Sequence, residues 1–248
     1  MNKVELLYAP SYETALKISS GKHIDKNDVS DKGIPFLPKN LSMVFVSGFG
    51  NTLKEVNGIR KQDEGFDWYY KGNGNVLRKD GDYLVLPLYG LWGGLETEIL
   101  MVHLINENLE PVYLGYTLAI DFTNTGLRRR NKSLKNLSHI SQTMVANEIA
   151  TSSFPEYDIA HTNITRGGKV IWNSDASAGK RNMWMNPKKL INFLFRNKEI
   201  LLPGMIFYTL TGATMSSDKA GIHLKKGDKI NSYLSDESIF LESIFDEK

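Results

Sequence analysis

One stretch of this chain decides its fold: Gly93-Gly94-Leu95-Glu96-Thr97-Glu98-Ile99-Leu100-Met101-Val102-His103-Leu104-Ile105. Its length and apolar character predict a long, largely buried β-strand. Because side chains alternate along a strand, Glu96 and Glu98 point to the same face. Two adjacent carboxylates in a buried strand repel each other, and this costs several kcal/mol unless a proton or a cation lies between them.

A third carboxylate is placed by counting along the following segment. The polar residues 106–111 predict a hairpin loop, and the apolar residues 112–122 predict the returning strand. If Ile105 pairs with Val112, then Glu96 pairs with Asp121, and three carboxylates meet on one face. A slip of one residue would turn Asp121 to the opposite face, so this register is a hypothesis.

Three clustered carboxylates favour a hard cation, with Mg²⁺ the first choice and Mn²⁺ or Ca²⁺ the alternatives. The chain contains no cysteine, which excludes disulfides, zinc–thiolate sites and thiol nucleophiles. A 2-oxo acid would chelate such an ion, and a metal on its ketone acidifies the neighbouring C–H and stabilises the enolate. The competing interpretation is that Glu96 and Glu98 lie on the solvated face of an edge strand.

The composition limits the function classes. Of 248 residues, 30 are Lys or Arg and 28 are Asp or Glu, which is not the basic surplus of a nucleic-acid-binding domain. No apolar run reaches the roughly 18 residues of a membrane span, so no membrane association is expected. The segment Met1-Asn2-Lys3-Val4-Glu5 lacks the apolar core of a signal peptide, and a cytoplasmic location is expected.

The rest of the sequence predicts many strands and few helices. Pro187–Asn197 is the clearest helix, because its apolar residues share one face, and Tyr12–Ile18 is a short candidate helix. A boundary near residue 41 would separate a small N-terminal region, 1–40, from the main domain, 41–248. This order argues against repeated βαβ units. The predicted strands are 42–46, 83–87, 96–105, 112–122, 169–172 and 205–210.

These motifs resemble the fumarylacetoacetate hydrolase superfamily. That family has a Glu-x-Glu strand, then a Gly-Tyr-Thr segment running into an Asp, and the three carboxylates bind Mg²⁺. The matching residues here are Glu96, Glu98 and Asp121, the last within Gly115-Tyr116-Thr117-Leu118-Ala119-Ile120-Asp121. The resemblance spans roughly residues 41–248. It implies an α+β, mainly β fold, a mixed β-sandwich roll with few helices and a small N-terminal appendage, in a homodimer or a higher homo-oligomer.

Two further motifs support the resemblance. Trp68-Tyr69-Tyr70-Lys71 matches an aromatic strand ending in a lysine, although Lys71 taken alone would be read as a surface residue at a strand end. Leu201-Leu202-Pro203-Gly204 matches a turn that leads to a threonine lining the site. The resemblance implies that Lys71 and Thr211 contact the substrate, with Thr214 as the alternative threonine.

Within the superfamily, the motifs are most similar to dehydratases of 2-keto-3-deoxy sugar acids. The matching segments are Ser47-Gly48-Phe49-Gly50-Asn51-Thr52, Trp68–Gly74 and Asp218-Lys219. In this interpretation Thr52 and Arg60 bind substrate, and Glu55 is the base that takes the C3 proton. The competing interpretation of Glu55 and Arg60 is an exposed, charged helix.

Departures from the family pattern limit the assignment. The hydrolases use a His–Glu pair after the Gly-rich turn, and the equivalent residues 53–60 contain no histidine. A substrate-binding lysine of the family is replaced by Ser141, which is expected to bind the substrate in its place. The expected function is therefore a Mg²⁺-dependent lyase that dehydrates a small 2-keto-3-deoxy sugar acid through a metal-bound enolate. The alternatives are a C–C bond hydrolase of an acylpyruvate or diketo acid, and a non-catalytic 2-oxo-acid-binding protein.

Three other features have local explanations. His103 has the opposite parity to Glu96 and Glu98 along the strand, which predicts a structural role. His139 follows the Asp121 strand and is expected to be a loop residue rather than part of the cleft. Arg128-Arg129-Arg130, with Lys132 and Lys135, could bind an anionic substrate or nucleic acid, but a solvated or salt-bridged loop is favoured.

Overall fold

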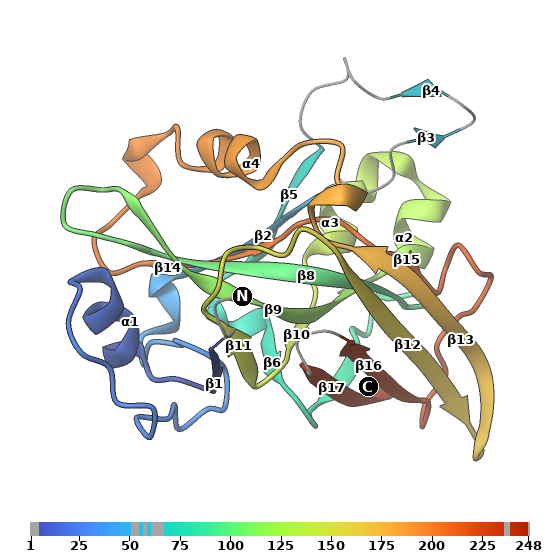
Figure 1. Ribbon diagram of the computed structural model, residues 1–248. Coiled ribbons are helices and arrows are strands. Elements are labelled where there is room, and N and C mark those ends of the chain that lie inside the picture. The colour runs from blue at the N-terminus through green and yellow to red at the C-terminus, as the bar shows by residue number, and fades with distance from the viewer. Residues whose placement is uncertain (1–4, 51–54, 57–58, 61–66, 236–238, 248) are drawn as a thin grey trace.

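The computed structural model describes residues 5–50, 55–56, 59–60, 67–235 and 239–247, with only the backbone at 55–56 and 59–60. Two β-sheets pack against each other, and a few short helices lie around them (Figure 1). The predicted α+β, mainly β architecture is confirmed. Repeated βαβ units do not occur in the described part of the chain.

Most elements are strands. The strands are β1 (Leu6–Tyr8), β2 (Val44–Phe49), β3 (Glu55–Val56), β4 (Ile59–Arg60), β5 (Trp68–Gly72), β6 (Leu77–Lys79), β7 (Tyr83–Leu86), β8 (Gly94–Ile105), β9 (Pro111–Thr123), β10 (Thr143–Val145), β11 (Glu148–Ala150), β12 (Asp158–Arg166), β13 (Lys169–Ala178), β14 (Ile206–Leu210), β15 (Met215–Ser216), β16 (Lys229–Leu234) and β17 (Phe240–Glu247). The α-helices are α1 (Tyr12–Ser19), α2 (Thr125–Arg130), α3 (Lys135–His139) and α4 (Pro187–Leu194).

The large sheet has ten strands, in the order β1-β11-β9-β8-β14-β2-β5, with β6, β10 and β15 attached beside it. The second sheet has five, in the order β13-β12-β16-β17-β7. Each sheet is mixed, since β14 pairs with β2 in parallel and β17 pairs with β7 in parallel, while the other neighbours along both orders are antiparallel. The long β8–β9 hairpin crosses the centre of the large sheet and positions the acidic residues.

The predicted pairing of Glu96 with Asp121 across β8 and β9 is confirmed, but the strand register that produces it differs from the one expected. Ile105 pairs with Pro111, not with Val112, so the count from the loop was wrong by one residue. A β-bulge between Val102 and His103 restores the register, since it adds one residue to β9. Gly115 lies at this bulge with φ of 151°, where a Cβ atom would come within 2.4 Å of the Ala150 carbonyl oxygen.

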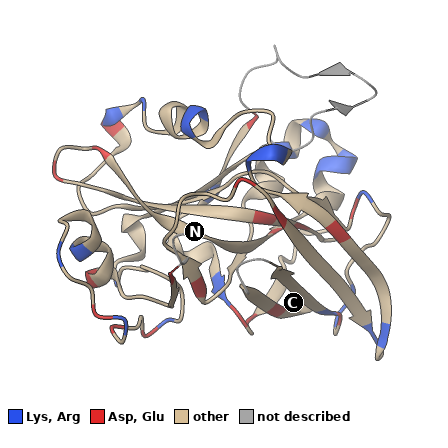
Figure 2. Cartoon of the chain, viewed as in Figure 1, with Lys and Arg blue, Asp and Glu red and all other residues tan. Residues whose placement is uncertain are grey.

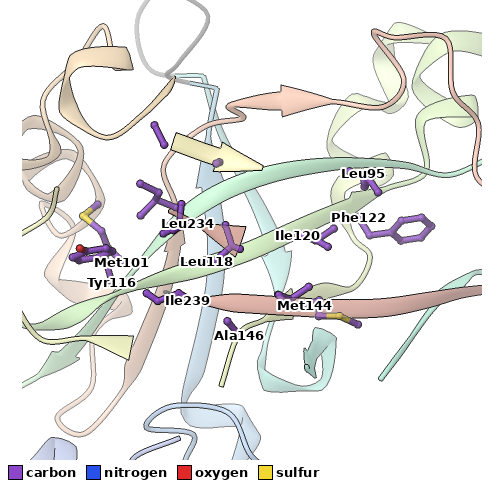
Figure 3. Close-up of a cluster of buried hydrophobic side chains, with 14 of the residues drawn as sticks. Leu95, Met101, Tyr116, Leu118, Ile120, Phe122, Met144, Ala146, Leu234 and Ile239 are labelled. Carbon is purple, nitrogen blue, oxygen red and sulfur yellow. The ribbon is translucent and has the colours of Figure 1, made fainter. Parts of the chain in front are cut away.

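The two faces of the β8–β9 hairpin have different partners. One face packs on the second sheet, and its buried side chains include Leu95, Met101, Leu118 and Ile120 (Figure 3). The other face has Glu96 and Glu98 at one end of β8. Toward the other end it bears apolar residues that pack on the N-terminal region: Leu100, Val102 and Leu104 against Leu7, Ala15 and Phe36.

The N-terminal region is closely joined to the large sheet. β1 forms an edge of that sheet by pairing with β11, and α1 begins at Ser11, whose hydroxyl accepts the Thr14 N–H at 3.1 Å. The predicted helix at Tyr12–Ile18 is therefore present. The predicted division near residue 41 stays a prediction, although residues on both sides of it share one apolar cluster.

Long-range pairing explains where element boundaries differ from expectation. β2 continues to Phe49, because Ser47 and Gly48 pair with both β14 and β5 despite their turn-like sequence. β13 extends to Ala178 by pairing along the length of β12. α4 begins as predicted, with Pro187 in its first turn and the Asn186 side chain accepting the Lys189 N–H at 2.9 Å. None of the described helices is long and apolar enough to cross a bilayer.

Candidate metal centre

Glu96, Glu98 and Asp121 form a compact acidic cluster on one face of the β8–β9 hairpin. One carboxylate oxygen from each residue lies within 4.8 Å of the others. Glu98 and Asp121 are buried, with 1% and 0% of their surface exposed, while Glu96 is partly exposed. The competing interpretation of a solvated edge strand is wrong, because β8 lies between β9 and β14 inside the large sheet.

Asp121 is fixed by two donors from β5. The Lys71 ammonium is fully buried, forms an ion pair with Oδ1 of Asp121, and donates to the Phe122 carbonyl oxygen at 3.0 Å. The Tyr69 hydroxyl donates to Oδ2 at 2.7 Å. Burial alone would raise the pKa of Asp121, but the charge of Lys71 and the nearby His139 outweigh it and hold that pKa below its ordinary value.

Glu98 lacks a comparable partner. Its Oε2 accepts the Gly212 N–H at 2.8 Å. Burial, followed by repulsion from Asp121 and Glu96, raises the pKa of Glu98 well above its ordinary value. Both causes disfavour the ionised carboxylate, so the cluster needs more positive charge than Lys71 supplies.

The donor set fits a divalent cation. Metal–oxygen distances of about 2.0–2.6 Å place two ligands of one ion at most roughly 5 Å apart, which these three oxygens satisfy. A set made only of carboxylate oxygens suits Mg²⁺, Mn²⁺ or Ca²⁺. Three protein oxygens also leave further coordination positions for water or a chelating ligand.

A cavity of about 310 Å³ lies over this cluster. Glu96 and Glu98 form part of its wall, together with Tyr69. Cationic side chains gather on the same wall: Arg128, Arg129, Lys135 and Lys219. Figure 2 shows the basic residues of α2 and α3 (blue) near the acidic segment of β8 (red), and Arg128 Nη2 lies 3.6 Å from Glu96 Oε1.

Comparisons with known proteins place this geometry in a recognised fold. A 2-keto-3-deoxy-D-arabinonate dehydratase complexed with magnesium and 2,5-dioxopentanoate superposes with a TM-score of 0.72 at 18% identity, covering 100% of this chain and 92% of that chain. A 5-carboxymethyl-2-hydroxymuconate delta-isomerase from Mycobacterium smegmatis gives a TM-score of 0.60 at 16% identity, over 82% of this chain and 77% of that one.

A third solved structure also has a similar fold. A 2-hydroxyhepta-2,4-diene-1,7-dioate isomerase from Mycobacterium marinum gives a TM-score of 0.60 at 14% identity, covering 84% of this chain and 76% of that chain. A scan against protein-family models and a search of curated proteins found no match.

The chain has the fold of the fumarylacetoacetate hydrolase superfamily. With the fold established, the residues expected from the resemblance can be located one by one. The three expected metal ligands come together, and Lys71 contacts one of them, so the reading of Lys71 as a surface lysine is wrong. Lys71 is not part of the cavity wall, however, because Asp121 and Phe122 hold its ammonium behind the carboxylates.

Thr211 and Thr214 were expected to contact the substrate, and the structure gives their hydroxyls other partners. Thr211 donates to the Ile99 carbonyl oxygen at 2.8 Å, and Thr214 donates to the Thr97 carbonyl oxygen at 2.9 Å. Neither threonine lines the cavity. Both fasten the segment after β14 to β8, which places the Gly212 N–H against Glu98.

Ser141 occupies the place expected for a family lysine, but it also lies off the cavity wall. Its hydroxyl donates to the Phe122 carbonyl oxygen, the acceptor that Lys71 also uses. Ser141 therefore acts on the position of Phe122 and Lys71 rather than on the cavity directly.

Three expected site residues, the base Glu55 and the substrate contacts Thr52 and Arg60, have no described side chains. Thr52 lies outside the described residues. Glu55 and Arg60 pair across the β3–β4 ladder, so the alternative of an exposed helix is wrong, and their side chains are outside the described part.

His139 and the basic run lie at the site, although the sequence assigned them other roles. His139 is buried and lines the cavity, its ring stacks on Tyr69 at 3.9 Å between centroids, and Nδ1 lies 3.8 Å from Asp121 Oδ2. The basic run is salt-bridged, as favoured, yet it also forms a wall of the site. The signal for both was their short distance in sequence after Asp121, the end of a ligand strand. His103 is structural as predicted, packed between Tyr113 and Phe195.

Proposed function

We propose that this protein is a Mg²⁺-dependent lyase that dehydrates a small 2-keto-3-deoxy sugar acid. The observation behind the proposal is the buried carboxylate cluster that opens on a cavity with cationic walls. Its similarity in fold to a dehydratase complexed with magnesium and 2,5-dioxopentanoate supports the same chemistry. A carboxylate substrate needs both features, since the cluster suits a metal and the wall suits an anion.

Glu96, Glu98 and Asp121 would hold the metal. When bound there, Mg²⁺ would polarise the ketone of a 2-oxo acid and make the neighbouring C–H bond more acidic. Mn²⁺ or Ca²⁺ fits the same oxygen donors.

Lys71 and Tyr69 would keep the ligand set in place. Their contacts with the two oxygens of Asp121 hold that carboxylate ionised and prevent it from rotating. In this assignment Lys71 is a positioning residue, not one that touches the substrate. The Gly212 N–H restrains Glu98 by binding its Oε2, but it does not outweigh the burial and repulsion that raise the pKa of Glu98.

Elimination of water needs a base for the C3 proton and a protonated group near the departing hydroxyl. We assign the base to Glu55, as expected from the sequence. Among described residues, Asp67 is another carboxylate on the cavity wall, but Lys135 Nζ binds it at 2.6 Å. Because Lys135 already binds Oδ1 of Asp67, that carboxylate is the less available of the two, and Glu55 remains the candidate.

Turnover of a panel of 2-keto-3-deoxy pentonates and hexonates with Mg²⁺ tests the proposal. Dehydration yields a single dioxo product, which a carbonyl-reactive reagent traps, whereas C–C hydrolysis of a diketo acid yields two acids. The expected result is metal-dependent formation of one product, lost with EDTA and in Glu98→Gln. The matched control is Glu110→Gln, an exposed residue at the far end of the same hairpin. Stabilisation by Mg²⁺ and pyruvate without any turnover would instead support a non-catalytic 2-oxo-acid-binding protein.

A further inference from the structure

The formal charges around the cavity fall into pairs. Arg129 donates to Asp218 Oδ2 from Nε at 3.1 Å and from Nη2 at 2.6 Å. Lys135 and Asp67 form a second pair, with Nζ and Oδ1 2.6 Å apart. These four side chains line the cavity and neutralise one another, so neither pair has charge left for a ligand.

Two cations of the same wall are not neutralised in this way. Lys219 has no acidic partner within 4.0 Å among the described residues, and it stands exposed at the cavity mouth. In the described part of the chain, Arg128 has one acidic neighbour within 4.0 Å, Glu96 at 3.6 Å, and Glu96 is a proposed metal ligand. Once a divalent cation takes up the charge of Glu96, Arg128 also lacks a counter-charge.

With a divalent cation bound, the formal charges of the acidic cluster would sum to zero. Three carboxylates there face one lysine, Lys71, and a divalent cation supplies the two missing positive charges. Among the described side chains, the metal-loaded cavity would therefore keep a surplus of two positive charges, those of Arg128 and Lys219. Glu55 and Arg60, assigned to the same site above, carry opposite formal charges and leave this sum unchanged. The carboxylate of a simple 2-oxo acid neutralises only one of them.

We propose that the cavity is built for a 2-oxo acid with a second carboxylate, which Arg128 and Lys219 bind at the end away from the metal. This deepens the proposed function and rests on it, since it specifies a sugar diacid rather than a monoacid. A phosphate would add about 1.5 to 2 negative charges, which exceeds the single charge that remains. A carboxylate matches that charge.

The backbone fixes where both cations stand relative to the ligands. α2 begins at Thr125, with one residue between it and the end of β9, so Arg128 follows Asp121 closely in the sequence. Ser216 pairs directly with Glu96 in the β15–β8 ladder, and the Leu95 N–H donates to Ser217 Oγ at 3.1 Å. Lys219 follows in the next turn of the chain. Arg128 thus comes from the segment that continues β9, and Lys219 comes from the turn after β15, the strand paired with β8. Both line the same cavity.

Binding of a matched pair of probes tests this proposal without any need for turnover. The probes are 2-oxoglutarate and 2-oxopentanoate, which have the same carbon chain and differ in the second carboxylate. Titration calorimetry with saturating Mg²⁺ is expected to give at least tenfold tighter binding of 2-oxoglutarate to the full-length protein. Higher salt should reduce that preference, since the cations stand near solvent.

Substitutions of Arg128 and Lys219 test whether these two residues cause the preference for 2-oxoglutarate. Arg128→Gln and Lys219→Gln should each weaken 2-oxoglutarate about three- to tenfold, and the double variant should bind both probes equally. Binding of 2-oxopentanoate should change less than threefold in all of them. Lys132→Gln is the matched control, an exposed residue of the same basic run that does not line the cavity, and it should keep the full preference.

The outcomes separate this proposal from the proposed function. Equal binding of both probes to the wild type, or a preference that survives in the double variant, overturns the second-carboxylate site and leaves the metal-dependent function standing. Failure of both probes to bind in the presence of Mg²⁺ overturns the metal-dependent function and the second-carboxylate site together.

Discussion

At the scale of single residues, the ion pair between Asp121 and Lys71 is the most consequential contact. Both side chains are fully buried, so each is desolvated and depends on the other. Removal of one partner from such a pair leaves an uncompensated charge in the interior. The cluster can tolerate this only if a proton or another cation replaces the lost charge.

Lys71→Met tests this dependence. The substitution keeps most of the side-chain volume, and we expect it to lower the free energy of unfolding by about 3–5 kcal/mol in EDTA. Added Mg²⁺ should restore more of this stability than it adds to the wild type, because a divalent cation replaces part of the lost charge. Denaturant unfolding with and without Mg²⁺ measures both quantities. Lys169→Met, at an exposed position, is the control and should behave as the wild type does.

His103 gives the stability of the protein a defined pH dependence. Burial lowers its pKa to about 3, so the folded protein keeps the imidazole neutral, whereas the unfolded chain binds a proton at its ordinary pKa. Stability is therefore unaffected well above pH 6.5 and is lost as the pH falls from about 6.5 toward 3. The loss reaches roughly 2 kcal/mol at pH 5.

The measurement is denaturant unfolding of the wild type and His103→Leu at pH 7.5 and pH 5. The wild type should lose about 2 kcal/mol more than the variant between these two pH values. His23→Leu removes an exposed histidine and should follow the wild type. If the free energy of unfolding changes with pH in the same way in the wild type and in His103→Leu, then the folded protein protonates His103 as readily as the unfolded chain does. That result would contradict the prediction.

At the scale of elements, the bulge in the β8–β9 hairpin determines that Asp121 lies on the same face as Glu96 and Glu98. Without the extra residue of β9, the register from the loop would place Ile120 rather than Asp121 opposite Glu96, and Asp121 would turn into the apolar core. Gly115 permits the bulge, since its φ of 151° and its approach to the Ala150 carbonyl leave no room for a Cβ atom.

Gly115→Ala should therefore disturb the metal centre from a distance. We expect a loss of more than about 2 kcal/mol in the free energy of unfolding, from backbone strain together with the close contact. Stabilisation by Mg²⁺ should weaken in the same variant. Gly168→Ala is the matched control, because Gly168 also has a positive φ but has open space around it. It should cost about 1 kcal/mol and leave the response to Mg²⁺ unchanged.

The β8–β9 hairpin was predictable because two neighbouring segments of the sequence determine it. The alternation of β8 placed Glu96 and Glu98 on one face, and the apolar run of β9 ended at Asp121. The exact pairing at the loop was not predictable, because a bulge depends on how β9 meets β11 at Ala150. Two compensating features, a misplaced starting pair and the bulge, led to the correct partner for Glu96.

At the scale of the whole molecule, the site is assembled from segments far apart in sequence. The acidic cluster is on β8 and β9, its lysine and tyrosine are on β5, and its cationic wall comes from α2, α3 and the turn after β15. Arg129 and Asp218 are 89 positions apart, yet they share a cavity wall. Periodicity and spacing cannot reveal such pairs, which explains why the basic run was expected to be a solvated or salt-bridged loop and not a wall of the site.

The second sheet contains an ion pair in which the carboxylate is buried and the arginine is partly exposed. Arg166 on β12 donates from Nε to Asp228 Oδ1 at 2.7 Å and from Nη2 to Oδ2 at 2.8 Å, while Asp228 is fully buried. Arg166→Met should lower the free energy of unfolding by about 1–3 kcal/mol, since it removes two hydrogen bonds from the buried Asp228 while the Lys225 N–H still binds Oδ2. Mg²⁺ affinity should change little, because neither Arg166 nor Asp228 lines the cavity. A thermal melt with a Mg²⁺ titration tests both expectations.

The central claim is that three carboxylates from two neighbouring strands hold one divalent ion. Electron paramagnetic resonance of Mn²⁺ titrated into the metal-free protein tests it most directly, since free and bound Mn²⁺ are counted separately. The account predicts one tight site per chain, competed by Mg²⁺, weakened at least a hundredfold in Glu98→Gln and unchanged in Glu110→Gln. A tight site that persists in Glu98→Gln, or no tight site in the wild type, would contradict the account.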